Sequence, residues 1–152
     1  MTNTATASPP QAAQFDFWVG DWALTWGENR DQHGSNRITK ILDDKVIFEH
    51  FTSHSPASPG YEGMSHSVWD TASNQWKQTW VDSQGTYLDF TGGWADGKMI
   101  LARQTVREGQ PIRQRMVWYD ITADAFEWHW ERSLDDGATW EIMWHISYQR
   151  KG

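Results

Sequence analysis

Turn-forming residues recur at short, regular intervals along almost the whole chain, and this spacing restricts the fold more than any other feature of the sequence. Clusters of Gly, Pro, Asp, Asn and Ser lie at 31–35, 42–45, 55–60, 70–74, 82–85, 95–97, 107–111, 121–125 and 134–138. The runs between them are rich in Trp, Ile, Val, Phe, Tyr and Thr, and none has the apolar spacing of a helix. The pattern predicts antiparallel strands joined by short hairpins, with a single helical or 3₁₀ turn at residues 15–18.

The same intervals give a count of about ten strands. We expect them at roughly 20–28, 36–43, 45–53, 62–70, 75–82, 86–93, 98–106, 112–120, 125–133 and 139–149. Hairpin-linked strands leave an exposed edge at each end of the sheet unless the sheet closes on itself. We therefore predict an all-β fold, a single antiparallel up-and-down barrel over residues 15–152, after a flexible tail over residues 1–14. The interior of such a barrel is wide enough to hold a small ligand.

Tryptophan is the second informative feature, because its 12 copies outnumber the six Phe and four Tyr together. Period-two alternation indicates which side chains face the interior. It places Gln78 and Asp82 inward with their Trp neighbours, and it places Ile142 inward with the rest of the last strand. An Arg that also faced inward could neutralise Asp82 or bind an acidic ligand group. The predicted ligand contacts are Trp26, Gln78, Trp80, Arg103, Arg115, Trp118, Trp128, Trp130 and Trp144.

Both ends of the predicted barrel carry a feature of a known group of folds. Gly20, Asp21 and Trp22 form a Gly-x-Trp motif at the start of the first strand, and Arg150 ends the last one. This arrangement resembles the lipocalins and their calycin relatives, and the resemblance implies that Trp22 stacks on Arg150 and closes the barrel base. The segments 15–22, 60–70, 76–85 and 130–140 further resemble a group of uncharacterised bacterial lipocalin-like proteins, which implies the fold and no activity.

Three residues are candidates for acid–base chemistry: Glu49, His50 and Asp82. Glu49 and His50 are neighbours in the strand sequence VIFEHF, so one of them must face inward. The strand is otherwise apolar on both faces, and periodicity does not decide which one it is. A carboxyl group in a Trp-walled cavity has its ionised form disfavoured and can act as an acid or a base. The alternative is a buried polar group that stabilises the core without catalysis.

Histidine positions raise the question of a metal or a haem group. His50 and His66 are expected on neighbouring strands, but no third ligand is evident, and we predict no metal site. The final-strand sequence WHISYQR, with His145, resembles the iron-ligating strand of haem-binding barrels of the nitrobindin type. Alternation turns Trp144 and Ile146 inward instead, so haem binding is a minor alternative and we expect no cofactor.

The segment SLDDGATW at 133–140 resembles the Asp box of sialidase propeller blades. A propeller needs several four-stranded blades, which 152 residues cannot supply. We therefore interpret the motif as a hairpin in which Asp135 and Asp136 accept hydrogen bonds from turn amides and Gly137 adopts a positive φ.

Charge and composition exclude several other classes of function. The net charge of −7 disfavours nucleic acids and anionic membranes as partners. Cysteine is absent, so the chain has no thiol chemistry. No G-x-S-x-G, P-loop or dinucleotide fingerprint occurs. The first 14 residues lack the basic and apolar regions of a signal peptide, so we expect a cytoplasmic location. The sequence is compatible with a homodimer.

Together these features predict that the barrel binds a small, largely apolar or aromatic molecule in a Trp-lined cavity. The first alternative is a small enzyme that uses Glu49, His50 or Asp82 for an acid–base isomerisation or cyclisation in the same cavity. A second is a barrel filled by its own side chains, which would serve as a structural or interaction module.

Overall fold

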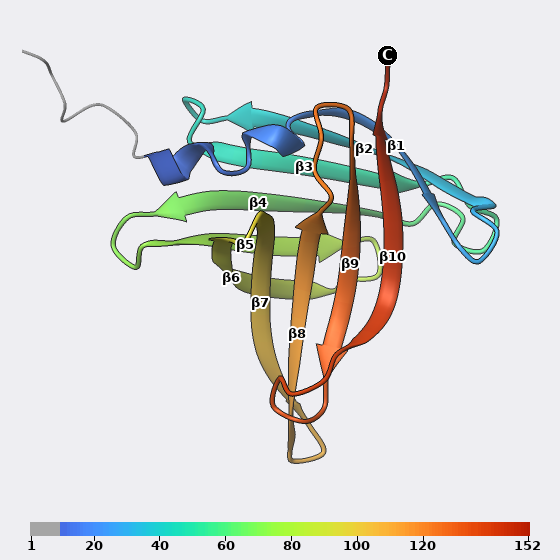
Figure 1. Ribbon diagram of the computed structural model, residues 1–152. Helices are drawn as coiled ribbons and strands as arrows, with labels where there is room; N and C mark the ends of the chain where they lie inside the picture. Colours follow the sequence, from blue (N-terminus) through green and yellow to red (C-terminus); the bar gives the residue numbers. More distant parts are fainter. Residues whose placement is uncertain (1–9) are drawn as a thin grey trace, which may run out of the picture.

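Ten antiparallel strands, each paired with its neighbours in the sequence, close into a barrel in the computed structural model, which describes residues 10–152 (Figure 1). The sheet closes because β1 pairs with β10 from Trp22 and Arg150 to Trp26 and Ile146. The predicted all-β, up-and-down barrel is thus confirmed. The strands are β1 (Gly20–Trp26), β2 (Gln32–Ile41), β3 (Val46–Ser53), β4 (Glu62–Asp70), β5 (Gln75–Asp82), β6 (Tyr87–Ala95), β7 (Lys98–Arg107), β8 (Gln110–Tyr119), β9 (Ala125–Ser133) and β10 (Glu141–Arg150).

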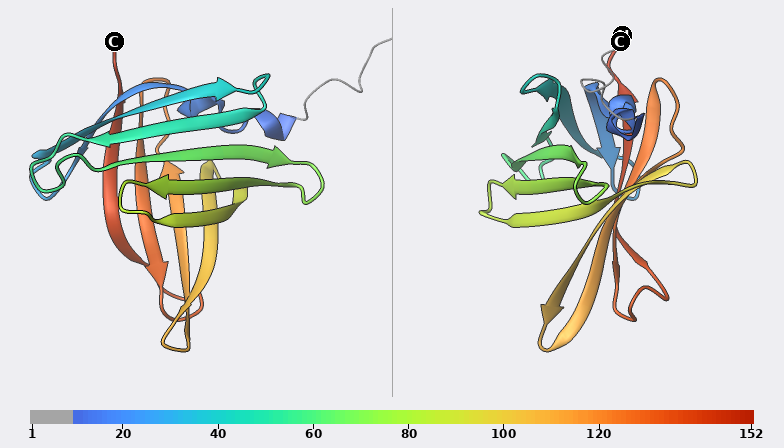
Figure 2. Two further views of the ribbon diagram at one scale, coloured as in Figure 1. Left: turned by 180° about the vertical axis from the view of Figure 1, so that it is seen from behind. Right: turned by 90° about the vertical axis from the view of Figure 1, so that its left-hand side faces the viewer.

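Two short 3₁₀ helices, η2 (Pro10–Ala13) and η3 (Asp16–Trp18), precede the first strand. The first nine residues of the tail that we predicted over 1–14 lie outside the described part of the chain. Figures 1 and 2 show η2 and η3 at the same end of the barrel as the C-terminus. Phe15 and Trp18 are fully buried there. The Phe15 ring lies 5.0 Å from the Trp76 ring and 5.1 Å from the Trp118 ring. These side chains therefore plug one end of the barrel, and the 3₁₀ turn expected at residues 15–18 is confirmed.

The second strand begins earlier than the sequence predicts. Residues 31–35 look like a turn, but Gln32–Ser35 pair with β1, and the turn lies before them, where the amide of Arg30 donates to the carbonyl of Gly27. Gly34 belongs to the strand, where it pairs with Leu24 and Ser53, and the ring of Trp26 packs against it. An ideal Cβ on Gly34 would lie 2.9 Å from that ring. Here glycine marks a close approach rather than a turn.

A β-bulge in β10 corrects the inward face that we predicted for the last strand. Its register with β9 shifts between Ile142 and Trp144, so Met143 is the extra residue. Beyond the bulge, Ile146 is buried as expected. Before it the alternation is reversed, and Ile142 lies opposite Glu131 on the outer face, 53% exposed. Ile142 is therefore not an interior residue.

The barrel is not paired along its full height. Pairing between β6 and β7 ends at Thr91 and Ala102, although β7 continues beside β8 to Arg107. β10 is similar, because its first half, from Glu141 to His145, pairs with β9 and not with β1. Figure 2 shows the β7–β8 and β9–β10 hairpins extending past the other strands at the end opposite η2 and η3. The end without the aromatic plug is therefore the more open one. None of the helices in residues 10–152 is both long and apolar enough to cross a membrane.

The predicted contact between Trp22 and Arg150 is confirmed. The guanidinium carbon of Arg150 lies 4.3 Å from the centre of the Trp22 ring. Arg150 also donates through Nη1 to the carbonyl of Val19 at 2.9 Å and through Nε to the carbonyl of Ala123 at 3.0 Å. One side chain thereby joins the segment before β1, the β8–β9 loop and β10 at the plugged end of the barrel.

Replacing Arg150 with alanine should lower the free energy of unfolding by about 1–2 kcal/mol, because the change removes both the cation–π contact and bonds to backbone carbonyls. Urea denaturation measures this. Arg150→Lys should be an incomplete rescue, since an ammonium lacks the planar fork of donors. The neighbouring Lys151→Ala serves as the control, because Lys151 is exposed. Equal stability of Arg150→Ala and Lys151→Ala would contradict the bracing role of Arg150.

Candidate functional site

A cavity of about 220 Å³ lies inside the barrel. An apolar cavity of roughly 150 Å³ is known to hold one benzene molecule, so this one has room for a molecule of one or two rings. Its wall is mostly aromatic and aliphatic, with a few polar groups. The lining residues are Glu49, Phe51, Tyr61, Trp80, Asp82, Leu88, Phe90, Met116, Trp118, Trp128, Trp130, Trp144, Ile146 and Tyr148.

Five of the predicted ligand contacts lie on this wall: Trp80, Trp118, Trp128, Trp130 and Trp144. They come from four strands, and the alternation of each strand turns them inward. Trp26 lies outside the wall and supports it, with its ring 5.5 Å from that of Trp144. Gln78 is buried, but it donates to the Ser67 hydroxyl at 2.9 Å and does not line the cavity.

The two predicted arginine contacts do not reach the cavity. Arg115 lies on the outer face of β8, where Nε bonds to Glu131 at 2.7 Å and the guanidinium stacks on Trp140 at 3.8 Å. Its position alternates with that of Met116, which faces inward. Arg103 donates to Gln114 on the part of β7 that pairs with β8 alone. Among residues 10–152, therefore, no arginine lies on the wall where it could neutralise a ligand carboxylate.

The structure answers the question of Glu49 and His50. Glu49 faces the cavity and is 7% exposed. Its Oε1 accepts a hydrogen bond from the Ser65 hydroxyl at 2.7 Å, and its Oε2 accepts one from Asn36 Nδ2 at 2.6 Å. Burial raises the pKa of Glu49, and these two hydrogen bonds oppose the shift only in part. His50 points outward, where its Nε2 lies 2.9 Å from Glu62.

Asp82 lines the cavity, but its oxygens are already fully engaged. Oδ2 accepts from the Tyr61 hydroxyl at 2.9 Å and from Trp80 Nε1 at 3.1 Å. Oδ1 accepts from the amides of Gln84 and Thr86. Burial alone would raise the pKa of Asp82, but these hydrogen bonds outweigh it and hold the pKa below its ordinary value. An ionised carboxylate with four donors is a poor base, so Asp82 orients Tyr61 and Trp80 instead.

Sequence reasoning missed the polar partners of Glu49. Asn36 and Ser65 are buried beside it, and Asn36 Nδ2 also donates to the Tyr148 hydroxyl at 2.9 Å. Burial, followed by the nearby Glu49 carboxyl, raises the pKa of Tyr148 far above its usual range. Alternation indicated that Tyr148 faces inward, but an Asn or Ser in a strand pattern looks the same at a solvent-facing position. Which of them meets Glu49 depends on the register of β2 and β4 against β3.

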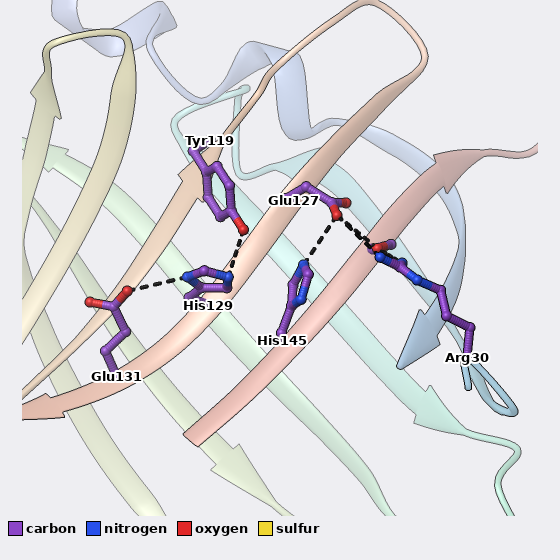
Figure 3. Close-up of polar contacts among 7 residues, drawn as sticks. Arg30, Tyr119, Glu127, His129, Glu131 and His145 are labelled. Atoms are coloured by element: carbon purple, nitrogen blue, oxygen red, sulfur yellow. Dashed lines mark hydrogen bonds and ion pairs between the residues drawn. The ribbon is translucent and has the colours of Figure 1, made fainter. Parts of the chain in front are cut away.

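A second polar cluster lies on the outer face of β8, β9 and β10 (Figure 3). The Tyr119 hydroxyl lies 2.6 Å from His129 Nε2, and His129 Nδ1 lies 3.2 Å from Glu131. Beside it, His145 Nε2 lies 3.1 Å from Glu127. The rings of His129 and His145 meet edge to face at 4.7 Å. His145 therefore points away from the cavity, which removes the basis for an interior haem ligand at this position.

Stability should decline between about pH 7 and pH 5 in part because of His129. Burial lowers its pKa in the folded state, although Glu131 opposes the shift, while the unfolded chain takes up the proton at the ordinary value. The unfolded state thus binds more protons in this range, and acid favours it. Urea denaturation at each pH should show a shallower decline for His129→Gln, and an unchanged one for the exposed His33→Gln. If stability declines equally with pH in the wild type, His129→Gln and His33→Gln, the decline does not come from His129.

The remaining predicted motifs have structural positions. His66 packs its ring on Phe48, and among residues 10–152 no three His, Asp or Glu side chains are arranged to hold a metal ion. In the SLDDGATW hairpin, Asp135 accepts from the amide and the hydroxyl of Thr139, which lowers its pKa to about 2. Asp136 pairs with Arg113 rather than with a turn amide, and Gly137 has a φ of 92°. The segment is a turn stabilised by hydrogen bonds between its own residues, and it does not line the cavity.

Comparison with known proteins adds no family. No protein-family model matches the chain, and no curated protein matches its sequence. What stands is a closed barrel of ten antiparallel strands, compatible with a lipocalin-like fold, whose many buried aromatic residues surround a cavity compatible with ligand binding.

Proposed function

We propose that this barrel binds a small, largely apolar molecule of one or two rings between its tryptophan side chains, as a lipocalin-like protein of the calycin type. One observation carries the proposal: an interior of close-packed aromatic side chains keeps a cavity of about 220 Å³. Protein interiors normally leave few voids larger than a water molecule, so an apolar space of this size is costly unless a ligand uses it. Burial of apolar ligand surface contributes roughly 25 cal/mol per Å², which makes micromolar affinity reachable after the entropy cost of binding.

Titration calorimetry with benzene, butylbenzene and 2-naphthol tests the proposal. We expect saturable binding at about one molecule per chain for at least one of them, with quenching of tryptophan fluorescence by 2-naphthol. Leu88→Trp adds an indole at the cavity wall and should weaken binding at least about tenfold, because the added ring occupies ligand space. Val81→Trp is the matched control, since Val81 lies on the outer face, 44% exposed. If the wild type binds none of the three compounds, the proposed function is wrong and a structural or interaction module remains.

A specific observation favours a second candidate, an acid–base enzyme in the same cavity. Burial raises the pKa of the Glu49 carboxyl and so favours its protonated form at a position that touches the ligand space, which suits a general acid in an isomerisation or cyclisation. His50 points away from the cavity, and the oxygens of Asp82 already accept four hydrogen bonds, so neither residue is suited to this step. Incubation of each bound compound followed by mass and chromatographic analysis distinguishes an enzyme from a carrier. An enzyme should lose turnover about a hundredfold in Glu49→Gln with binding retained.

A further inference from the structure

Two polar groups of the cavity wall, Glu49 and Tyr148, are arranged around one amide. Asn36 Nδ2 donates to Glu49 Oε2 at 2.6 Å and to the Tyr148 hydroxyl oxygen at 2.9 Å. Two oxygens bonded to the same nitrogen lie close enough for a single ligand atom to contact both. Asn36 does not line the cavity, whereas Glu49 and Tyr148 do. The amide therefore fixes the two oxygens from behind and leaves their other sides toward the ligand space.

The hydroxyl hydrogen of Tyr148 is available to a ligand. A phenol has one hydrogen to donate, and Tyr148 already uses its oxygen as the acceptor for Asn36. The ring is fixed by stacking on Phe126, with centroids 4.3 Å apart. Asn36 Nδ2 donates to the Tyr148 oxygen, and the buried Asn36 Oδ1 has no hydrogen-bond partner among the described residues, so Asn36 does not take the Tyr148 hydrogen. The cavity borders the same side chain.

Glu49 offers a second hydrogen. The cavity wall, as far as the described residues form it, contains no Lys, Arg or His. A carboxyl group that is 7% exposed and has no cation beside it is more stable in its neutral form. Both oxygens already accept hydrogen bonds, one from Ser65 and one from Asn36. A neutral carboxylic acid in an apolar site acts as a hydrogen-bond donor, and its hydrogen then needs an acceptor.

We propose that Glu49 and Tyr148 form a paired donor site for the carbonyl oxygen of the ligand, positioned by Asn36. This rests on the proposed function and narrows it to neutral apolar carbonyl compounds, such as ketones or aldehydes that carry a ring. A carbonyl oxygen has two lone pairs and can accept from both groups at once. A carboxylate ligand would meet the ionised Asp82, with no Lys, Arg or His among the described residues of the wall. An ammonium ligand would meet two donors at Glu49 and Tyr148, while the oxygens of Asp82 already accept four hydrogen bonds.

Four compounds of nearly equal shape test the ligand class by titration calorimetry at neutral pH: 4-phenylbutan-2-one, butylbenzene, 3-phenylpropionic acid and 3-phenylpropylamine. The ketone should bind about tenfold more tightly than butylbenzene, a gain within the range expected from two hydrogen bonds. The acid and the amine should both bind more weakly than the ketone. A direct report comes from infrared spectroscopy, because hydrogen bonding shifts the carbonyl stretch of the bound ketone to lower frequency.

Variants separate the donor pair from simple packing. Tyr148→Phe should still bind butylbenzene, lose most of the tenfold preference for the ketone, and reduce the infrared shift. Glu49→Leu should act in the same direction, whereas Glu49→Gln keeps a neutral donor and should retain the preference. Butylbenzene binding shows that each variant is folded with its cavity intact.

An unchanged ketone preference in Tyr148→Phe, or an acid or amine that binds more tightly than the ketone, would overturn the donor pair while leaving a ligand-binding barrel in place. Failure of the wild type to bind any of the four compounds would overturn the proposed function as well.

Discussion

Replacing Phe15 with alanine should lower the free energy of unfolding by about 3–5 kcal/mol, the cost of deleting a buried aromatic ring from a site that cannot collapse. Phe15 is fully buried, although it belongs to no strand. Its ring lies 5.0 Å from that of Trp18 and about as far from those of Trp76 and Trp118. Removing it leaves a hole between rigid indoles on two strands and the η3 turn.

Chemical denaturation followed by tryptophan fluorescence measures this loss, and the variant retains every tryptophan. Phe15→Leu should lose less, because it keeps most of the apolar volume. Tyr87→Ala, which truncates an aromatic ring that is 64% exposed, is the control and should change stability by about 0.5 kcal/mol or less. If Phe15→Ala unfolds at the same denaturant concentration as Tyr87→Ala, the N-terminal turn does not plug the barrel. Loss of the plug should also weaken ligand binding, because Trp118 lies between Phe15 and the cavity.

The strand order and the closure of the barrel could be predicted from the sequence because hairpin turns and period-two alternation are local signals. The contact between Trp22 and Arg150 was predictable for a different reason, because the resemblance to the lipocalins and their calycin relatives implies it. Most of the aromatic wall followed from alternation as well. These predictions require only the order of the hairpins along the chain and not the register between paired strands.

The predictions that failed depend on events along a single strand or between strands. Ile142 was assigned to the interior because nothing in the sequence marks the bulge at Met143, which reverses the alternation. Arg115 was predicted as a ligand contact because β8 is apolar on both faces and alternation does not decide which face is inward. Its partner Glu131 is recognised only once β8 and β9 are in register. The donor pair at Glu49 was missed because its partners lie on other strands. Asn36 lies on β2, which pairs with β3, and Tyr148 lies on β10, which is not a neighbour of β3 in the sheet.

Replacing Gly92 with alanine should lower the free energy of unfolding by about 3 kcal/mol. Gly92 lies where β6 leaves its pairing with β5 and begins to pair with β7, opposite Trp76 on one side and Leu101 on the other. An ideal Cβ there would lie 2.1 Å from the carbonyl oxygen of Ile100. That contact is with backbone and not with a flexible side chain, so the two strands must separate to admit a methyl group.

The adjacent residue supplies a matched control for this prediction. An ideal Cβ on Gly93 meets no heavy atom within 4 Å, so Gly93→Ala should be close to neutral, although both changes add the same methyl group to the same strand. Thermal denaturation of the two variants should separate them by several degrees. Because β6 also carries Leu88 and Phe90 on the cavity wall, Gly92→Ala should weaken ligand binding in the fraction that remains folded. Equal stability of the two variants would mean that β6 and β7 can move apart at little cost. The barrel wall would then be flexible, and not rigid, where these two strands begin to pair.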